Sequence, residues 1–157
     1  MDEQFFYCPV CGNLAHMAIA SGVTPICCSE EMLALHPKTS EEGNEHHLPV
    51  VECLGNQYVC VKVGRTPHPV TEQHRICIIC LKTTKEFIMR RLRPGHPAEA
   101  KFRFRGRPLC VYSFCNIHGL WCSEVPPEIA DKCCQSKCTD EKCNDNKEKR
   151  ECAHPMT

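Results

Sequence analysis

A cysteine and a histidine lie three residues apart in the segment Phe114-Cys115-Asn116-Ile117-His118-Gly119. A thiolate and an imidazole at this spacing, in a turn that contains glycine, can bind one metal ion together. Two upstream segments add further imidazoles, because His46 and His47 are adjacent and His68 is followed by His74. The three segments together offer five imidazoles, two of them on adjacent residues, and one thiolate. That donor set is typical of a metal centre and not of a hydrophobic core.

Four cysteines near the N-terminus form a second donor group. Cys8 and Cys11 are separated by two residues and followed by Gly12, and Cys27 and Cys28 are adjacent. Two thiolates spaced as in the first pair can hold one ion if the backbone turns sharply between them, and glycine gives the freedom for that turn. Few large apolar side chains surround these cysteines, so we expect the metal to order the segment. Spacing alone fits zinc and iron equally.

The composition narrows the class of protein. The chain has 157 residues, of which 42% are hydrophobic, enough for one ordinary domain or two small ones. Sixteen cysteines would indicate a disulfide framework in a secreted protein, but the acidic start Met1-Asp2-Glu3 precedes no apolar run of signal-peptide length. Nineteen basic and nineteen acidic residues balance, which gives no footprint for nucleic acid, and no run approaches the roughly 20 apolar residues of a membrane span. We therefore expect a cytoplasmic metal protein.

The elements that must position the first donor group are strands. Between residues 47 and 123 the chain has short runs rich in Val, Ile, Tyr and Phe, separated by Gly, Pro and Asn. This pattern predicts an antiparallel β domain, and the pair Gly55-Asn56 predicts a hairpin. The expected strands cover residues 50–53, 58–63, 76–81, 87–92, 100–104 and 109–114. Short strands with frequent turns predict a small β-sandwich.

The tail over residues 125–157 is charged and has almost no large apolar side chains, so we expect no core of its own there. A coreless segment with several thiols needs an ordering agent, and we expect four of them to hold a third metal centre. An iron-sulfur cluster is the first hypothesis, with zinc or free thiols as alternatives. The five cysteines of the tail are Cys133, Cys134, Cys138, Cys143 and Cys152.

Other cysteines fit a core role. Cys77 and Cys80 lie in one expected strand, where residues three apart point to opposite faces, so they predict no chelate. Cys53 and Cys60 are expected as diagonal neighbours on one face of the hairpin, beyond easy disulfide reach. We interpret both as small buried hydrophobes, and Cys110, which alternates with aromatic residues, in the same way.

The three segments of the first donor group, in this order, resemble the catalytic iron site of superoxide reductases of the desulfoferrodoxin and neelaredoxin family, from about residue 6 to residue 124. The resemblance implies a mainly β protein, with an immunoglobulin-like antiparallel β-sandwich in residues 37–124. It also implies one ferrous ion with an open position opposite the thiolate. The implied ligands are His47, His68, His74, Cys115 and His118.

The first four cysteines resemble the desulforedoxin module, which binds a single iron. This resemblance makes residues 1–36 a metal module with Cys8, Cys11, Cys27 and Cys28 as ligands, although Ser29 stands where that module usually has glycine. A zinc site that only stabilises the fold is the alternative. Residues 125–157 lie outside the resemblance.

The implied reaction is the one-electron reduction of superoxide to hydrogen peroxide, without release of oxygen. Glu45 matches the glutamate that closes over the open position and helps to expel peroxide. His46 replaces the usual lysine, which attracts superoxide, and this places the efficiency in doubt but not the reaction. Other cations near the ligand loops could share the attraction, namely Lys62, Arg65 and Arg75.

The Cys115 sulfur is expected to accept backbone N–H bonds from Asn116 and Ile117, which would tune its electron donation. Other functions stay open: a rubredoxin-like electron-transfer protein that binds iron without superoxide turnover, a structural zinc protein, or an enzyme with dismutase activity. The resemblance alone implies a rubredoxin-like electron donor and a homodimer.

Overall fold

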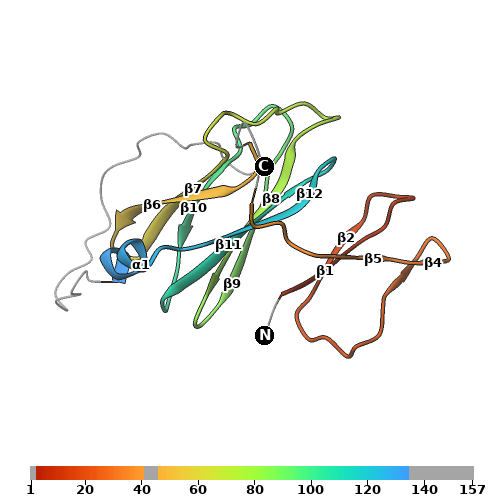
Figure 1. The fold of residues 1–157 in the computed structure, drawn as a ribbon, viewed down its shortest axis with the longest axis horizontal. Helices are drawn as coiled ribbons and strands as arrows, with labels where there is room; N and C mark the ends of the chain where they lie inside the picture. The colour runs from red at the N-terminus through yellow and green to blue at the C-terminus, as the bar shows by residue number, and fades with distance from the viewer. Residues whose placement is uncertain (1–2, 41–45, 135–157) are drawn as a thin grey trace, which may run out of the picture.

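The structure is a computed structural model in which residues 3–40 and 46–134 are described. Within this part of the chain it is built from strands and one helix (Figure 1). The N-terminal strands are β1 (Gln4–Tyr7), β2 (Leu14–Met17), β3 (Ile26–Cys27), β4 (Glu30–Glu31) and β5 (Leu33–Leu35). The remaining elements are β6 (Pro49–Gly55), β7 (Tyr58–Val63), β8 (Ile76–Thr83), β9 (Phe87–Arg91), β10 (Glu99–Arg103), β11 (Pro108–Cys115), β12 (Gly119–Glu124) and the helix α1 (Pro127–Cys134).

Two antiparallel sheets form the expected β-sandwich. One sheet has the order β10-β7-β6 and the other the order β12-β11-β8-β9. Asn56 and Gln57 have positive φ angles of 51° and 61°, so the turn after Gly55 closes the predicted hairpin between β6 and β7. Side chains from both sheets meet in one core, in which Val61, Ile79 and Phe102 are fully buried. The expected mainly β fold is confirmed.

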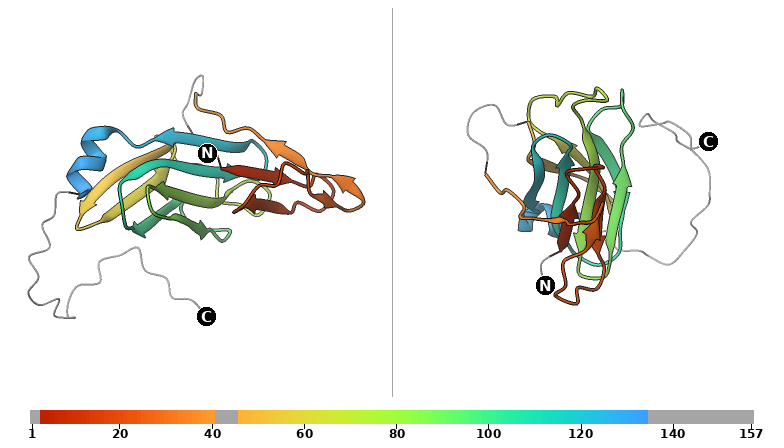
Figure 2. Two further views of the ribbon diagram at one scale, coloured as in Figure 1. Left: turned by 90° about the horizontal axis from the view of Figure 1, so that it is seen from below. Right: turned by 90° about the vertical axis from the view of Figure 1, so that its right-hand side faces the viewer.

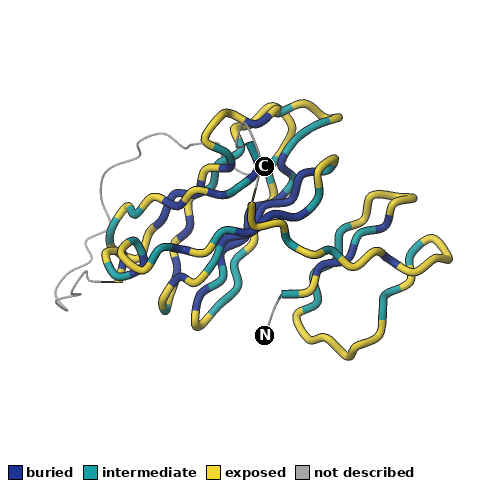
Figure 3. The backbone as a smooth tube through the Cα atoms, in the orientation of Figure 1, coloured by how far each residue is buried: buried dark blue, intermediate teal, exposed yellow. Residues whose placement is uncertain are grey.

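The N-terminal strands form a separate small module beside the sandwich. Its sheet has the order β2-β1-β5, and β3 and β4 form a short hairpin of their own. Figure 2 shows this module extending from one end of the sandwich. Figure 3 shows that most residues of the module are exposed, whereas the buried residues gather in the central strands of the sandwich. Phe5 of β1 packs against Ile78, Cys80 and Tyr112 on the outer face of the second sheet, which joins the two parts.

Helix α1 packs against β6 and adds Ala130 and Cys133 to the sandwich core. The sequence predicts a tail without a core here, because this segment offers so few apolar side chains. Cys133 is bonded to Cys53, and their Cα atoms are 5.7 Å apart. The prediction that Cys53 and Cys60 lie on the same face of the hairpin is wrong. An irregularity after Cys53 leaves Cys60 opposite Glu52, on the other face of the hairpin.

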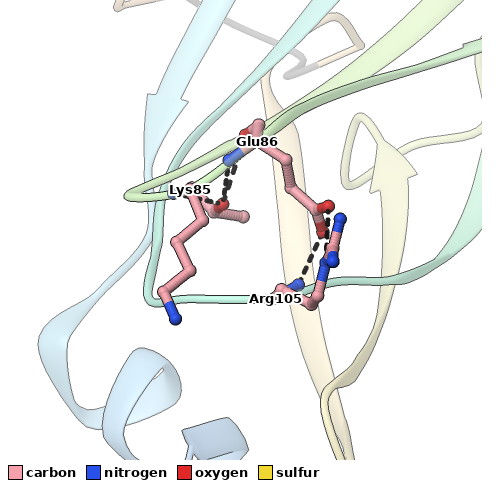
Figure 4. A network of polar contacts seen from close by, with 4 residues as sticks. Lys85, Glu86 and Arg105 are labelled. Carbon is pink, nitrogen blue, oxygen red and sulfur yellow. Dashed lines mark hydrogen bonds and ion pairs between the residues drawn. The ribbon is translucent and has the colours of Figure 1, made fainter.

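Polar contacts at the end of the sandwich near α1 fix its loops (Figure 4). The Thr83 hydroxyl accepts the N–H groups of Lys85 and Glu86 at 3.1 and 2.9 Å and closes the turn between β8 and β9. The Glu86 carboxylate accepts the backbone N–H of Arg105 at 2.6 Å. Two loops are thereby tied together. Among the described residues, no helix has the length and apolar character needed to cross a membrane.

Candidate metal centres

Five donor side chains meet at the other end of the sandwich. His47 lies two residues before β6, and His68 and His74 lie in the long connection between β7 and β8. Cys115 ends β11, and His118 lies in the turn to β12. That connection is the yellow-green loop at the top of Figure 1. One donor atom from each of the five lies within 4.8 Å of all the others. The structure thus brings together all five ligands that the sequence predicts for the catalytic iron.

The four imidazoles form a closed ring. His47 contacts His68, His68 contacts His74, His74 contacts His118, and His118 contacts His47, with centroid distances of 4.9, 4.6, 4.8 and 4.5 Å. Neighbouring rings are inclined by 66° to 78°, so each meets the next edge-on. Their nitrogens point to a common centre, where His118 Nδ1 lies 2.8 Å from His47 Nε2 and 3.2 Å from His74 Nε2. Cys115 Sγ approaches His118 Nδ1 at 3.5 Å.

This arrangement fits a metal ion. The buried Nε2 atom of His68 has no hydrogen-bond partner, while its Nδ1 atom is 2.8 Å from the carbonyl oxygen of Pro69. A buried nitrogen without a partner is costly in a protein, and coordination would satisfy it. Burial lowers the pKa of His68 to about 4, so its imidazole is neutral at neutral pH and offers a lone pair.

Several contacts position His47. The Ser113 hydroxyl, fully buried, donates to the His47 carbonyl oxygen at 2.8 Å. The Trp121 ring stacks on the His47 ring at 4.7 Å and 13°. Gly64, with a φ angle of +80°, lies so close that a Cβ atom there would be 2.5 Å from the His46 carbonyl oxygen. In the sequence, Gly64 is only one more glycine with the freedom to form a turn. Its close approach to the His46 backbone could not be predicted from the sequence.

Asn116 joins the two loops that carry His74 and Cys115. Its Oδ1 atom accepts the backbone N–H of Arg75 at 2.8 Å, and its Nδ2 atom donates to the Gln73 carbonyl oxygen at 2.8 Å. Its own backbone N–H donates to the Arg75 carbonyl oxygen at 3.2 Å. Three hydrogen bonds therefore hold the residues on either side of His74 against the end of β11.

The environment of Cys115 is apolar, yet it favours a thiolate in part. Burial raises the pKa of the Cys115 thiol, and backbone N–H bonds from His118 and Ile117 lower it. The sequence predicts these bonds from Asn116 and Ile117. The Asn116 part of that prediction is wrong, because its N–H is bonded to Arg75. The turn places the N–H of His118 at the sulfur instead.

One cation near this centre was missed by the sequence analysis. Lys38 Nζ donates to the His118 carbonyl oxygen at 3.0 Å and lies 4.8 Å above the Trp121 ring. Its positive charge also lowers the pKa of Cys115. Lys38 is 80 residues from His118, so only the fold reveals the contact. Of the two residues predicted for catalysis, Glu45 lies outside the described residues, and the His46 ring is 6.4 Å from the His47 ring.

The four N-terminal cysteines also converge. The donor atoms of Cys8, Cys11, Cys27 and Cys28 lie within 4.8 Å of one another. The backbone N–H groups of Cys11 and Val10 donate to Cys8 and lower its pKa to about 7, which favours the thiolate that a metal requires. These four residues form a second donor group, as the sequence predicts.

The tail cysteines do not form a group in the described part of the chain. Cys133 is bonded to Cys53 and buried, whereas Cys134 is exposed and donates to the Gly106 carbonyl oxygen at 3.7 Å. Cys138, Cys143 and Cys152 lie outside the described residues. A third metal centre with four cysteine ligands would therefore draw on Cys134 and these three, and it stays a prediction.

Known proteins are similar to this chain in both sequence and fold. Residues 39–124 match the family model described as Desulfoferrodoxin. A desulfoferrodoxin homolog from Archaeoglobus fulgidus is 38% identical over 118 residues, which cover 75% of this chain and 94% of the relative. The chain belongs to the desulfoferrodoxin family. A desulfoferrodoxin from Syntrophotalea carbinolica is 36% identical and covers 77% of this chain and 95% of its own length.

A solved structure is also similar to this chain. The superoxide reductase from Treponema pallidum is similar with a TM-score of 0.69 and 32% identity, over 78% of this chain and 98% of that one. Desulfoferrodoxins bind iron, and the two donor groups of this chain fit that metal, because imidazole and thiolate are both good iron ligands.

Proposed function

We propose that this protein is a superoxide reductase, which converts superoxide to hydrogen peroxide by the transfer of one electron. The observation that carries the proposal is the closed ring of four imidazoles with a cysteine sulfur beside it. Five protein donors leave room for one small ligand on a six-coordinate ion, whereas structural sites use up all positions. Similarity to the superoxide reductase from Treponema pallidum supports the same function.

Iron bound by His47, His68, His74, His118 and Cys115 would supply the electron, and two protons complete the peroxide. The protein's part is to hold these donors in place before the substrate arrives. Ser113, Trp121 and Asn116 do so through the contacts described above. Burial of His47, His68 and Cys115 limits water around the donors and strengthens electrostatic interactions there.

Positive charge beside the site would attract the superoxide anion. Lys38 is the cation that the structure adds to this argument, since its ammonium group lies against the His118 carbonyl oxygen. Arg75 is a second candidate, at the end of the His74 loop. Lys62 is exposed and lies 3.7 Å from the Glu52 carboxylate, which offsets its charge. We propose that Lys38 supplies part of the attraction for superoxide that the family's usual lysine, replaced here by His46, would provide. We also propose that Glu45 assists the departure of peroxide.

We propose further that residues 1–36 would hold a second iron through Cys8, Cys11, Cys27 and Cys28. That iron would supply a route for electrons from a rubredoxin-like donor. A homodimer in the cytoplasm is part of the same proposal and rests on resemblance. The packing of Phe5 against the sandwich supports a fixed relation between module and sandwich.

Replacement of Cys115 tests the proposal. Cys115→Ser should keep the fold but lose superoxide reduction by pre-reduced protein, because an alcohol oxygen donates far less charge than a thiolate. Cys28→Ser is the matched control, since it should disturb only the N-terminal site and leave the reaction of pre-reduced protein intact. If Cys115→Ser reduces superoxide at the parent rate, the assignment of this residue is wrong.

A further inference from the structure

A cleft of about 1030 Å3 separates the N-terminal module from the outer face of the β11–β12 hairpin. Residues of β1 and the segment around Leu35 line one wall, and Cys110, Tyr112 and Cys122 line the other. Both cysteines are free thiols and belong to neither donor group. The sequence predicts Cys110 to be a small buried hydrophobe, but this residue is only half-buried and borders the cleft.

The two thiols are neighbours across the hairpin. Cys110 pairs with Glu124 and Tyr112 pairs with Cys122, so Cys110 and Cys122 are diagonal partners on one face of the sheet. The Cys122 thiol lies near enough to Cys110 to lower the pKa of the Cys110 thiol. A disulfide needs Cα atoms about 4.4–6.8 Å apart, slightly closer than a regular diagonal pair. Cys110 follows a register irregularity in β11, and Glu124 ends β12, so the backbone there can make this adjustment.

The charges around the pair favour one thiolate and one thiol. The neighbouring Cys122 thiol lowers the pKa of Cys110 to about 7, with help from the Tyr112 hydroxyl and the positive charge of Lys82. Burial and, to a smaller extent, the charge of Glu3 oppose this shift. Lys82 lies directly opposite Cys110 on β8 and also binds Glu3, with Nζ to Oε1 at 3.0 Å. The neighbouring Cys110 is the main reason why the pKa of the Cys122 thiol is raised, so Cys122 keeps its proton.

We propose that Cys110 and Cys122 form a second, thiol-based site that reduces hydroperoxides and closes to a disulfide at the wall of this cleft. Hydrogen peroxide is the product of the proposed superoxide reduction, so the natural supply of this substrate rests on that function. The open cleft gives a small peroxide access to Cys110 without passage through either metal centre.

The reaction balances with peroxide as the only oxidant. The Cys110 thiolate attacks one peroxide oxygen, an S–O bond forms, the O–O bond breaks, and hydroxide leaves. This hydroxide takes the proton of the Cys122 thiol and becomes water. The Cys122 thiolate then attacks the sulfenic sulfur of Cys110, an S–S bond forms, and a second hydroxide leaves and is protonated from solvent. The two thiols lose two electrons, and the peroxide gains them.

Peptide mapping after addition of hydrogen peroxide tests this site. Iron-loaded full-length protein is mixed with one equivalent of hydrogen peroxide, its remaining thiols are alkylated, and its peptides are analysed by mass spectrometry. We expect a Cys110–Cys122 disulfide in the wild type. In Cys122→Ala, Cys110 should instead be trapped as a sulfenic acid by a cyclic 1,3-dione. Cys80 lies on the same face but is fully buried, with its pKa raised to about 12 by burial, and is the internal control that should stay reduced.

Two results would overturn the proposal. In the first, Cys110 of the peroxide-treated protein is alkylated as fully as Cys80 is after denaturation, which would mean that Cys110 stayed reduced. In the second, Cys110 and Cys122 of the wild type are oxidised no faster than Cys110 alone in Cys122→Ala. Cys115→Ser separates this site from the proposed function. It should still form the disulfide with added peroxide, although it no longer produces peroxide from superoxide. If the wild type forms the disulfide with added peroxide but not with superoxide, the thiol site stands and the proposed superoxide reduction fails.

Discussion

Removal of the Asn116 side chain should weaken iron binding at the catalytic site without unfolding the sandwich. The side chain makes two hydrogen bonds of 2.8 Å, to the Arg75 N–H and the Gln73 carbonyl, on either side of His74. Each is worth about 0.5–1.5 kcal/mol net, so Asn116→Ala loses about 1–3 kcal/mol of loop order. If iron binding requires that order in full, the dissociation constant rises by a factor of about 5 to 150.

The assay is competition for iron against a chelator, with the unfolding of the metal-free protein measured in parallel. Asn116→Asp keeps the acceptor for Arg75 but loses the donor to Gln73. It should therefore show at least half of the loss of iron affinity that Asn116→Ala shows. Gln73→Ala is the control, because only the backbone carbonyl of Gln73 takes part. The reasoning is refuted if Asn116→Ala retains iron as tightly as the wild type, or if the metal-free protein loses the same stability.

Three further predictions concern backbone strain and the tail. Gly64→Ala should weaken iron binding, because the added methyl group would displace the His46 carbonyl. Gly95→Ala is the control, since Gly95 has the same left-handed strain at φ +79° but a Cβ atom there would meet no heavy atom within 4 Å. Equal iron loss in both variants would refute the contact argument. Ser29 has a φ angle of 66°, so Ser29→Gly should stabilise the N-terminal metal module by about 1 kcal/mol net against metal loss to a chelator, and an unchanged midpoint would contradict this. Truncation after Cys134 should remove iron and acid-labile sulfide if the tail holds a cluster, and equal contents in both chains would exclude it.

The donor groups could be predicted from the sequence because each is encoded in short spacings. Cys115 and His118 share one turn, and Cys8 and Cys11 share another, so local chemistry identified them before any fold was known. The hairpin at Gly55 followed from turn chemistry in the same way. Its register did not, because one irregularity after Cys53 moved Cys60 to the opposite face.

Features that depend on distant contacts were not predictable. Lys38 reaches His118 across 80 residues, and no local pattern marks it. Strand β12 was missed because residues 119–124 lack a clear alternation of apolar and polar residues. Helix α1 was missed because its apolar face is limited to a few small residues, which the bond between Cys133 and Cys53 and the packing on β6 hold in the core.

The ratio of hydrogen peroxide formed to superoxide consumed tests the central claim most directly. Pre-reduced, iron-loaded protein is exposed to a pulse of superoxide in a Cys110→Ala and Cys122→Ala double variant, so that the thiol site cannot remove the product. The account predicts one peroxide for each superoxide and no oxygen. One peroxide for every two superoxides, with matching oxygen release, would show dismutation and contradict the account.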